Sequence, residues 1–171
     1  QAAAHVRCSR PRGARRRHAP SGEAPPRTPG PAPWAARARA AADDRRAAGA
    51  RLLLWGQDGY PAGLQEIPDA PPILWVRGRK KLLARPLVAM VGARNASSLG
   101  SRMAKRLAEE LGDAGFVVVS GLARGIDTAA HHGALPQGTV AVMAGGLDVV
   151  YPPENAALAA EIAEKGLCIS E

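Results

Sequence analysis

The chain has 171 residues, a formal net charge of +8, 46% hydrophobic residues and only 4% aromatic residues. This length suits one ordinary domain with a small appendage. Residues 1–50 hold 11 of the 23 basic residues and 3 of the 15 acidic residues, which leaves 12 of each in residues 51–171. Because the excess charge belongs to the N-terminal segment, it gives no argument that the remainder binds nucleic acid.

Cysteine usage and hydropathy indicate a cytoplasmic protein. No apolar run approaches the roughly 18 residues of a membrane span, and the arginines at 15–17 precede no apolar stretch of the kind found in export signals. Cys8 and Cys168 lie in unlike contexts, so we predict a buried Cys168 thiol and neither a disulfide nor a metal site. The chain does not begin with Met and stops just after an expected strand, so we expect it to be a fragment.

The first 50 residues read as two segments. Residues 1–33 are rich in Arg, Pro, Ala and Gly, so we expect a disordered low-complexity segment rather than a DNA-binding arm. GC-rich DNA read in the wrong frame yields the same composition, and the segment is therefore also a candidate for non-native sequence. Residues 34–50 are Ala-rich, with Arg and Asp, and predict a helical lead-in that ends near Gly49.

Apolar runs alternate with amphipathic stretches through residues 51–171. The run at 87–91 is continuous, as in a strand buried on both faces. Met103, Leu107 and Leu111, with Ala104 and Ala108 beside them, predict one apolar helix face. The pattern predicts a Rossmann-like α/β domain, an open parallel sheet with helices on both faces that is incomplete at its C-terminus. The expected strands cover about 52–55, 73–76, 87–91, 116–119, 139–143 and 167–170, and the expected helices about 101–113, 126–134 and 156–165.

Three glycine-rich loops follow the carboxyl ends of expected strands: GARNASSLG (92–100), SGLARGID (120–127) and AGGLDVVYPPEN (144–155). Ligands of open parallel sheets bind at this edge. Glycine lets backbone approach a ligand closely, and each loop precedes a helix whose N-terminus offers N–H donors. The three loops together therefore predict a site for an anion, with tight turns alone as the alternative explanation.

Arg94 is the strongest single candidate because it leaves the first strand where a guanidinium can bind a phosphate. Arg124 occupies the comparable place in the second loop. A binding role and an exposed loop arginine without a role are equally good interpretations of it. Asn95 and Ser97 add polar groups, although Ser97 is equally placed to cap the next helix. Asp127 is expected to be a structural acid early in the second helix.

Several common sites are missing from the sequence. The first loop lacks the G-x-G-x-x-G spacing of a dinucleotide site, and there is no P-loop and no G-x-S-x-G nucleophile turn. His131 and His132 are adjacent on an expected helix, so they point about 100° apart and make a poor pair of metal ligands. We therefore expect no catalytic residues, no metal and no cofactor.

The loops resemble the signatures of the DNA-processing protein A (DprA/Smf) family. VGARNASSLG (91–100) resembles its V-G-S-R-x-S-x-x-G motif, with Ala93 in the serine position, and residues 120–135 and 138–155 resemble its second and third motifs. Residues 58–78 resemble its lead-in, so the likeness covers about residues 40–171.

The resemblance implies a non-enzymatic protein that binds and protects incoming single-stranded DNA, loads the RecA recombinase during natural transformation, and forms a homodimer when full length. It matches Arg94 to the family's phosphate-binding arginine. The expected DNA-binding residues, from the loops and the resemblance together, are Gly92, Arg94, Asn95, Ser97, Ser120, Gly121, Arg124, Gly145 and Gly146.

One departure from the family pattern concerns the third loop. Many members carry a basic residue after its Tyr-Pro, whereas Tyr151-Pro152 is followed here by Pro153 and Glu154, which removes one expected phosphate contact. The alternative function is a nucleotide hydrolase of the related lysine-decarboxylase-like phosphoribohydrolase fold. Those enzymes use P-G-G-x-G-T-x-x-E, and the run at 144–149 lacks its third glycine and threonine.

Overall fold

The computed structural model describes residues 42–43, 46 and 49–171. The predictions for residues 1–33 and for most of residues 34–50 lie outside the described residues, although Ala42, Asp43 and Arg46 are helical. Within the described part of the chain, no helix combines the length and the apolar character that crossing a bilayer requires.

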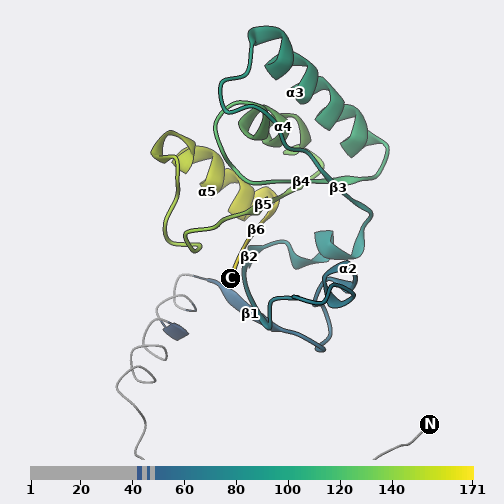
Figure 1. Ribbon diagram of the computed structural model, residues 1–171, viewed down its shortest axis with the longest axis vertical. Helices are drawn as coiled ribbons and strands as arrows, with labels where there is room; N and C mark the ends of the chain where they lie inside the picture. Colours follow the sequence, from purple (N-terminus) through teal and green to yellow (C-terminus); the bar gives the residue numbers. More distant parts are fainter. Residues whose placement is uncertain (1–41, 44–45, 47–48) are drawn as a thin grey trace, which may run out of the picture. The chain divides into compact units, whose positions relative to one another are not determined.

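Strands alternate with helices along the described domain (Figure 1). The strands are β1 (Arg51–Leu54), β2 (Ile73–Gly78), β3 (Leu87–Ala89), β4 (Val117–Ser120), β5 (Thr139–Val142) and β6 (Leu167–Ser170). The α-helices are α2 (Ala62–Gln65), α3 (Ser98–Asp113), α4 (Ile126–Ala134) and α5 (Ala156–Lys165), and the 3₁₀ helices are η1 (Lys80–Ala84) and η2 (Pro153–Asn155).

The strands form one sheet in the order β1-β2-β6-β5-β4-β3. The four strands β6, β5, β4 and β3 are parallel, which confirms the Rossmann-like α/β prediction. The sheet is mixed, however, because β2 pairs antiparallel with both β1 and β6. Residues 55–72, which contain α2, join β1 to β2 and bring Leu54 opposite Ile73 in the antiparallel register.

The three longer helices share one face of the sheet. The strands β3, β4, β5 and β6 are neighbours in chain order, so the sheet grows in one direction. With right-handed connections, each helix between two of these strands then lies on the same face of the sheet. α3 and α4 lie side by side, and α5 contacts β2, β5 and β6 (Figure 1). The opposite face is covered by Tyr60, by Leu64 of α2 and by Leu82 of η1, so helices lie on both faces but very unevenly.

The expected burial of β3 is wrong, and the expected apolar face of α3 is buried only in part. β3 is an edge strand with one neighbour, so Leu87 is 42% exposed and Val91, beyond the strand end, is 81% exposed. In α3, Ala104 and Ala108 of the expected apolar face are buried and Leu111 packs against the core, whereas Met103 and Leu107 are exposed.

The close contact between α3 and α4 explains this choice of helix face. A Cβ atom added to Gly133 of α4 would lie 2.2 Å from the Lys105 backbone oxygen of α3. Two backbones that approach so closely leave room only for small side chains between them. Alanines and glycines therefore fill this interface, and the larger side chains of α3 turn outward.

His131 of α4 is fully buried against the sheet. The Thr139 hydroxyl donates to the Val118 carbonyl oxygen at 2.8 Å, so it accepts from His131 Nδ1, which lies 2.9 Å away. Nε2 has no hydrogen-bond partner. Burial, reinforced by the charge of His132, lowers the pKa of His131 from 6.5 to about 4.

The buried His131 predicts a loss of stability in mild acid. The unfolded chain takes up the proton at its pKa of 6.5 but the folded chain resists until about pH 4, so the stabilisation is complete above pH 6.5 and falls between these values. The free energy of unfolding should drop by about 3 kcal/mol across this window, since each pKa unit corresponds to about 1.4 kcal/mol.

Denaturant titrations at several pH values test this prediction. His131→Gln should flatten the pH dependence, whereas His132→Gln on the more exposed side of the same helix should keep most of it. An NMR signal of His131 that titrates near pH 6.5 in the folded protein would contradict the prediction.

Candidate nucleic-acid interface

Three loops at the carboxyl ends of β3, β4 and β5 enclose a cavity of about 550 Å³, which we call the loop pocket. The loops cover residues 90–97, 121–125 and 143–152. The parallel arrangement of the three strands brings these loops to one edge of the sheet, as the sequence predicts. The pocket is lined by Arg94, Asn95, Gly121, Ala123, Arg124, Asp127, Val142, Met143, Ala144, Gly145, Val149, Tyr151 and Pro152.

The first loop rests directly on the second. Gly125 has φ +78°, and a Cβ atom added there would lie 2.2 Å from the Ala93 oxygen and 2.6 Å from the Arg94 oxygen. The Ile126 N–H donates to the Ala93 oxygen at 3.2 Å. Gly92 in turn leaves room for the Ile126 side chain, which a Cβ atom at Gly92 would meet at 2.6 Å. These contacts fix the backbone of Arg94 relative to that of Arg124.

Two side chains hold the second loop in an uncommon conformation. Leu122 has φ 59°, a left-handed conformation that leucine rarely adopts, and its side chain is fully buried. The Asp127 carboxylate accepts from the N–H groups of Gly121 at 3.2 Å and Ala123 at 3.4 Å. The Asn155 amide donates to the carbonyl oxygen of Leu122 at 2.9 Å. Hydrogen bonds to both kinds of backbone group therefore compensate for the strain of this turn.

Asn155 also joins the third loop region to the second. Its amide nitrogen lies 2.9 Å from the Thr128 hydroxyl oxygen and 3.4 Å from the Ala123 carbonyl oxygen, and the residue is only 6% exposed. A buried amide with several partners specifies one geometry, because removing any partner leaves a desolvated polar group without a hydrogen bond.

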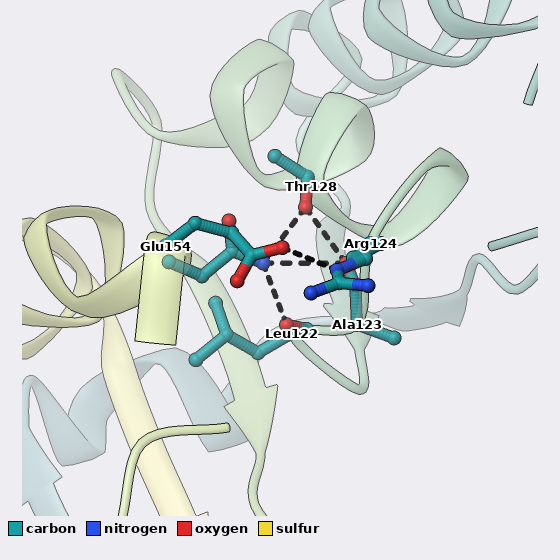
Figure 2. Close-up of polar contacts among 6 residues, drawn as sticks. Leu122, Ala123, Arg124, Thr128 and Glu154 are labelled. Atoms are coloured by element: carbon teal, nitrogen blue, oxygen red, sulfur yellow. Dashed lines mark hydrogen bonds and ion pairs between the residues drawn. The ribbon is translucent and has the colours of Figure 1, made fainter. Parts of the chain in front are cut away.

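An ion pair joins the second loop to η2. The Arg124 Nε–H donates to Glu154 Oε1, and Figure 2 shows the two side chains meeting beside Leu122, Ala123 and Thr128. This hydrogen bond raises the pKa of the Arg124 guanidinium and lowers the pKa of the Glu154 carboxyl. Both side chains are at least half exposed, so water and salt screen their attraction.

Arg94 differs from Arg124 in its partners. Arg94 is exposed, lines the loop pocket and forms no ion pair with any described residue. The lining residues include two arginines and one carboxylate, Asp127, whose Oδ2 is already engaged by backbone N–H groups. Arg94 is thus the cation of the pocket that is most accessible to an anion.

The structure brings five of the nine expected residues to the pocket wall: Arg94, Asn95, Gly121, Arg124 and Gly145. The other four support the wall from outside it. Ser97 caps α3 by accepting from the Gly100 N–H at 3.1 Å, which is the alternative role that the sequence left open. The buried Ser120 hydroxyl donates to the Met90 oxygen at 2.7 Å, so it ties β4 to the end of β3.

The two remaining residues are glycines that shape the backbone. Gly92 admits the Ile126 side chain, and the buried Gly146 has φ +100° in the turn of the third loop. Some of the N–H donors expected at the helix starts are already occupied. In the first turn of α3, the Gly100 N–H donates to the Ser97 hydroxyl oxygen. At the start of α4, the Ile126 N–H donates to the Ala93 oxygen. The Gly121 N–H is likewise occupied, by Asp127.

Sequence reasoning missed the roles of Asn155 and Glu154. An asparagine at the end of a Pro-rich turn is an ordinary helix-capping signal, yet Asn155 makes no side-chain cap on α5 and bonds the second loop instead. In the sequence, Glu154 was noted only because Pro153 and Glu154 follow Tyr151-Pro152 where the family resemblance implies a basic residue. Its pairing with Arg124, 30 positions earlier, leaves no local signal in the sequence.

Gly125→Ala should destabilise the protein strongly because the added methyl group would meet backbone oxygens of the first loop, which cannot move aside independently. We expect a loss of at least about 3 kcal/mol in the free energy of unfolding. Gly115→Ala is the matched control, since Gly115 also has positive φ but has nothing within 4 Å of the added Cβ. It should cost only about 1–2 kcal/mol. Equal losses in urea titrations would show that the contact between the loops contributes nothing.

Comparison with known proteins gives one consistent family. The family model described as DNA recombination-mediator protein A matches residues 51–171. The chain is 46% identical over 116 residues to the DNA processing protein DprA of Streptococcus pneumoniae, which covers 67% of this chain and 41% of that protein. It is 42% identical over 118 residues to Protein Smf of a Synechocystis strain, covering 66% of this chain and 30% of that protein.

Two solved structures share the fold. The crystal structure of DprA from Streptococcus pneumoniae matches with a TM-score of 0.66 at 42% identity, over 70% of this chain and 43% of that chain. A structure described as giving insight into the single-stranded DNA binding mode of DNA processing protein A from Helicobacter pylori matches with a TM-score of 0.63 at 34% identity, over 71% and 54%. The chain spans less than half the length of the pneumococcal and Synechocystis relatives, and it belongs to the DNA recombination-mediator protein A family, also called DprA/Smf.

Proposed function

We propose that this chain binds the sugar–phosphate backbone of single-stranded DNA in the loop pocket, in the service of DNA uptake and recombination. The observation that carries the proposal is that Arg94 and Arg124, from two different loops, line one cavity at the carboxyl edge of a parallel sheet. The Helicobacter pylori relative, whose structure is described by its single-stranded DNA binding mode, supports the choice of ligand.

Recognition in this pocket is through phosphates. Arg94 is available to bind a phosphate group directly, because it has no carboxylate partner among the described residues. Arg124 must break its ion pair with Glu154 before it binds a phosphate. The cost of breaking this pair reduces what Arg124 contributes to the affinity for DNA. Phosphate contacts carry no base information, and Tyr151 is the one aromatic residue of the pocket lining, so the binding has little sequence preference.

The arrangement supports binding rather than catalysis. Asp127 is the one carboxylate among the residues that line the loop pocket, and its oxygen accepts two backbone N–H groups. A carboxylate used in this way holds the second loop and is poorly placed to act as a general base. No group of three or more His, Cys, Asp or Glu residues in the described ranges could hold a metal ion.

The remaining expectations concern the longer protein. Loading of RecA, formation of a homodimer and action in the cytoplasm during natural transformation are proposals for the full-length family member, since the chain spans only 41% of its pneumococcal relative.

Arg94→Ala should weaken binding of a labelled oligo-dT by roughly 1.5–3 kcal/mol, the range for a charge-assisted hydrogen bond. This corresponds to about a tenfold to hundredfold rise in Kd, measured by fluorescence anisotropy at low salt with the full chain. Arg106→Ala is the matched control, because Arg106 is an exposed arginine paired with Glu110 on α3 and lies outside the loop pocket. Equal effects of the two substitutions would remove Arg94 from the site.

Glu154→Gln should strengthen binding of the same oligonucleotide by about threefold, since the substitution frees Arg124 from its ion pair. Glu161→Gln removes the same charge from an ion pair with Lys165 on α5 and should change little. The gain from Glu154→Gln should also vanish in an Arg124→Ala background, because the two effects share one guanidinium. A gain that persists without Arg124 would show that Glu154 acts only through its general field.

A further inference from the structure

A second concave surface adjoins the loop pocket. This flanking groove lies between α3, α4 and η2 and has a volume of about 630 Å³. Its lining includes Arg102 and Lys105 of α3, His132 of α4, and Arg124 with Glu154. Arg124 also lines the loop pocket, so the two cavities meet at this side chain.

The charge of the groove favours an anion. Three permanent cations, Arg102, Lys105 and Arg124, face one carboxylate, that of Glu154. Arg102 forms no ion pair with any described residue, and Lys105 reaches Glu109 of its own helix only at 3.9 Å. By contrast, Arg106 on the same helix is bound to Glu110 at 2.7 Å and lies outside the groove. The cations that line the groove are thus the weakly paired ones of α3.

The form of the groove favours a strand rather than a single ion. It is a shallow surface much larger than one phosphate, and its lining includes no Phe, Tyr or Trp side chain. Arg102 and Lys105 lie three residues apart on a helix, which places their Cβ atoms about 5–6 Å apart on one side of it. A row of cations suits the phosphates of an extended nucleic acid, and without Phe, Tyr or Trp the groove offers little base stacking beyond the His132 ring.

We infer that the flanking groove is a second segment of the single-stranded DNA path, in which Arg102 and Lys105 bind phosphates that follow those held in the loop pocket. Arg124 joins the two segments, because it lines both. The inference rests on the proposed function, since the groove extends a path that begins at Arg94. It adds a length requirement: a short oligonucleotide fills the loop pocket alone, and a longer one also reaches α3.

The test compares two oligonucleotides and two double variants of the full chain. Oligo-dT of about 4 and about 16 nucleotides spans the range of common single-strand site sizes. Arg102→Gln with Lys105→Gln removes the two groove cations. Arg106→Gln with Lys165→Gln removes the same charge from exposed side chains outside both cavities. Each variant must first show the melting transition of the wild-type protein.

The groove variant should weaken binding of the longer oligonucleotide by about three- to tenfold more than the control variant does, as expected for exposed charge contacts. Its salt dependence should fall by roughly 0.7 in log–log slope for each phosphate that the variant no longer binds. Binding of the short oligonucleotide should stay within the change seen for the control.

Other outcomes overturn the inference in distinguishable ways. If the groove and control variants behave alike while Arg94→Ala still weakens binding, the groove lies off the path and the proposed function stands. If the groove variant weakens both lengths equally, the groove is not a later segment. If the folded wild-type chain binds neither oligonucleotide, both the inference and the proposed function fail.

Discussion

The contact between the backbone of Gly125 and the carbonyl groups of Ala93 and Arg94 sets the geometry of the whole candidate interface. It leaves no room for a side chain at position 125 and requires positive φ there. Through it, the loop that carries Arg94 is seated on the loop that carries Arg124. Asp127 and Asn155 then hold the second loop by hydrogen bonds to its N–H and carbonyl groups. Because these contacts fix the backbones of Arg94 and Arg124, less backbone freedom is lost when the two residues bind a phosphate than if the loops were mobile.

The sequence predicted the strands, the glycine-rich loops and the edge of the sheet on which the candidate site lies. These features depend on local properties of the chain, namely apolar runs and glycines. The sequence was insufficient wherever a residue's role depends on a distant partner. The spacing of Met103 and Leu107 predicted that they lie on the apolar face of α3. They are exposed, because α4 approaches α3 so closely at Gly133 that only alanine and glycine fit between the two helices. Ser120 was expected in the binding site, and its buried hydroxyl donates to the backbone oxygen of Met90, 30 residues away.

Positive charges exceed negative charges only slightly in and around the loop pocket. Glu154 occupies a position where a cation would strengthen phosphate binding, and its carboxylate holds Arg124 instead. The affinity therefore depends on which arginine is paired, and the total charge of the domain, with 12 basic and 12 acidic residues after position 50, contributes little. The formal net charge of +8 resides in residues 1–50 and would add a salt-sensitive attraction to any polyanion.

The position of β3 at one edge of the sheet has a consequence for the shape of the site. A crevice forms in α/β proteins where neighbouring strands send their connections to opposite faces, and the outer side of β3 is the point at which this reversal can occur. A parallel strand added there would end beside the loop of Arg94 and bring a fourth loop to the same rim. Arg94 would then lie in the middle of a cleft and be accessible to a ligand from both sides, whereas without that strand it lies at the edge of the site.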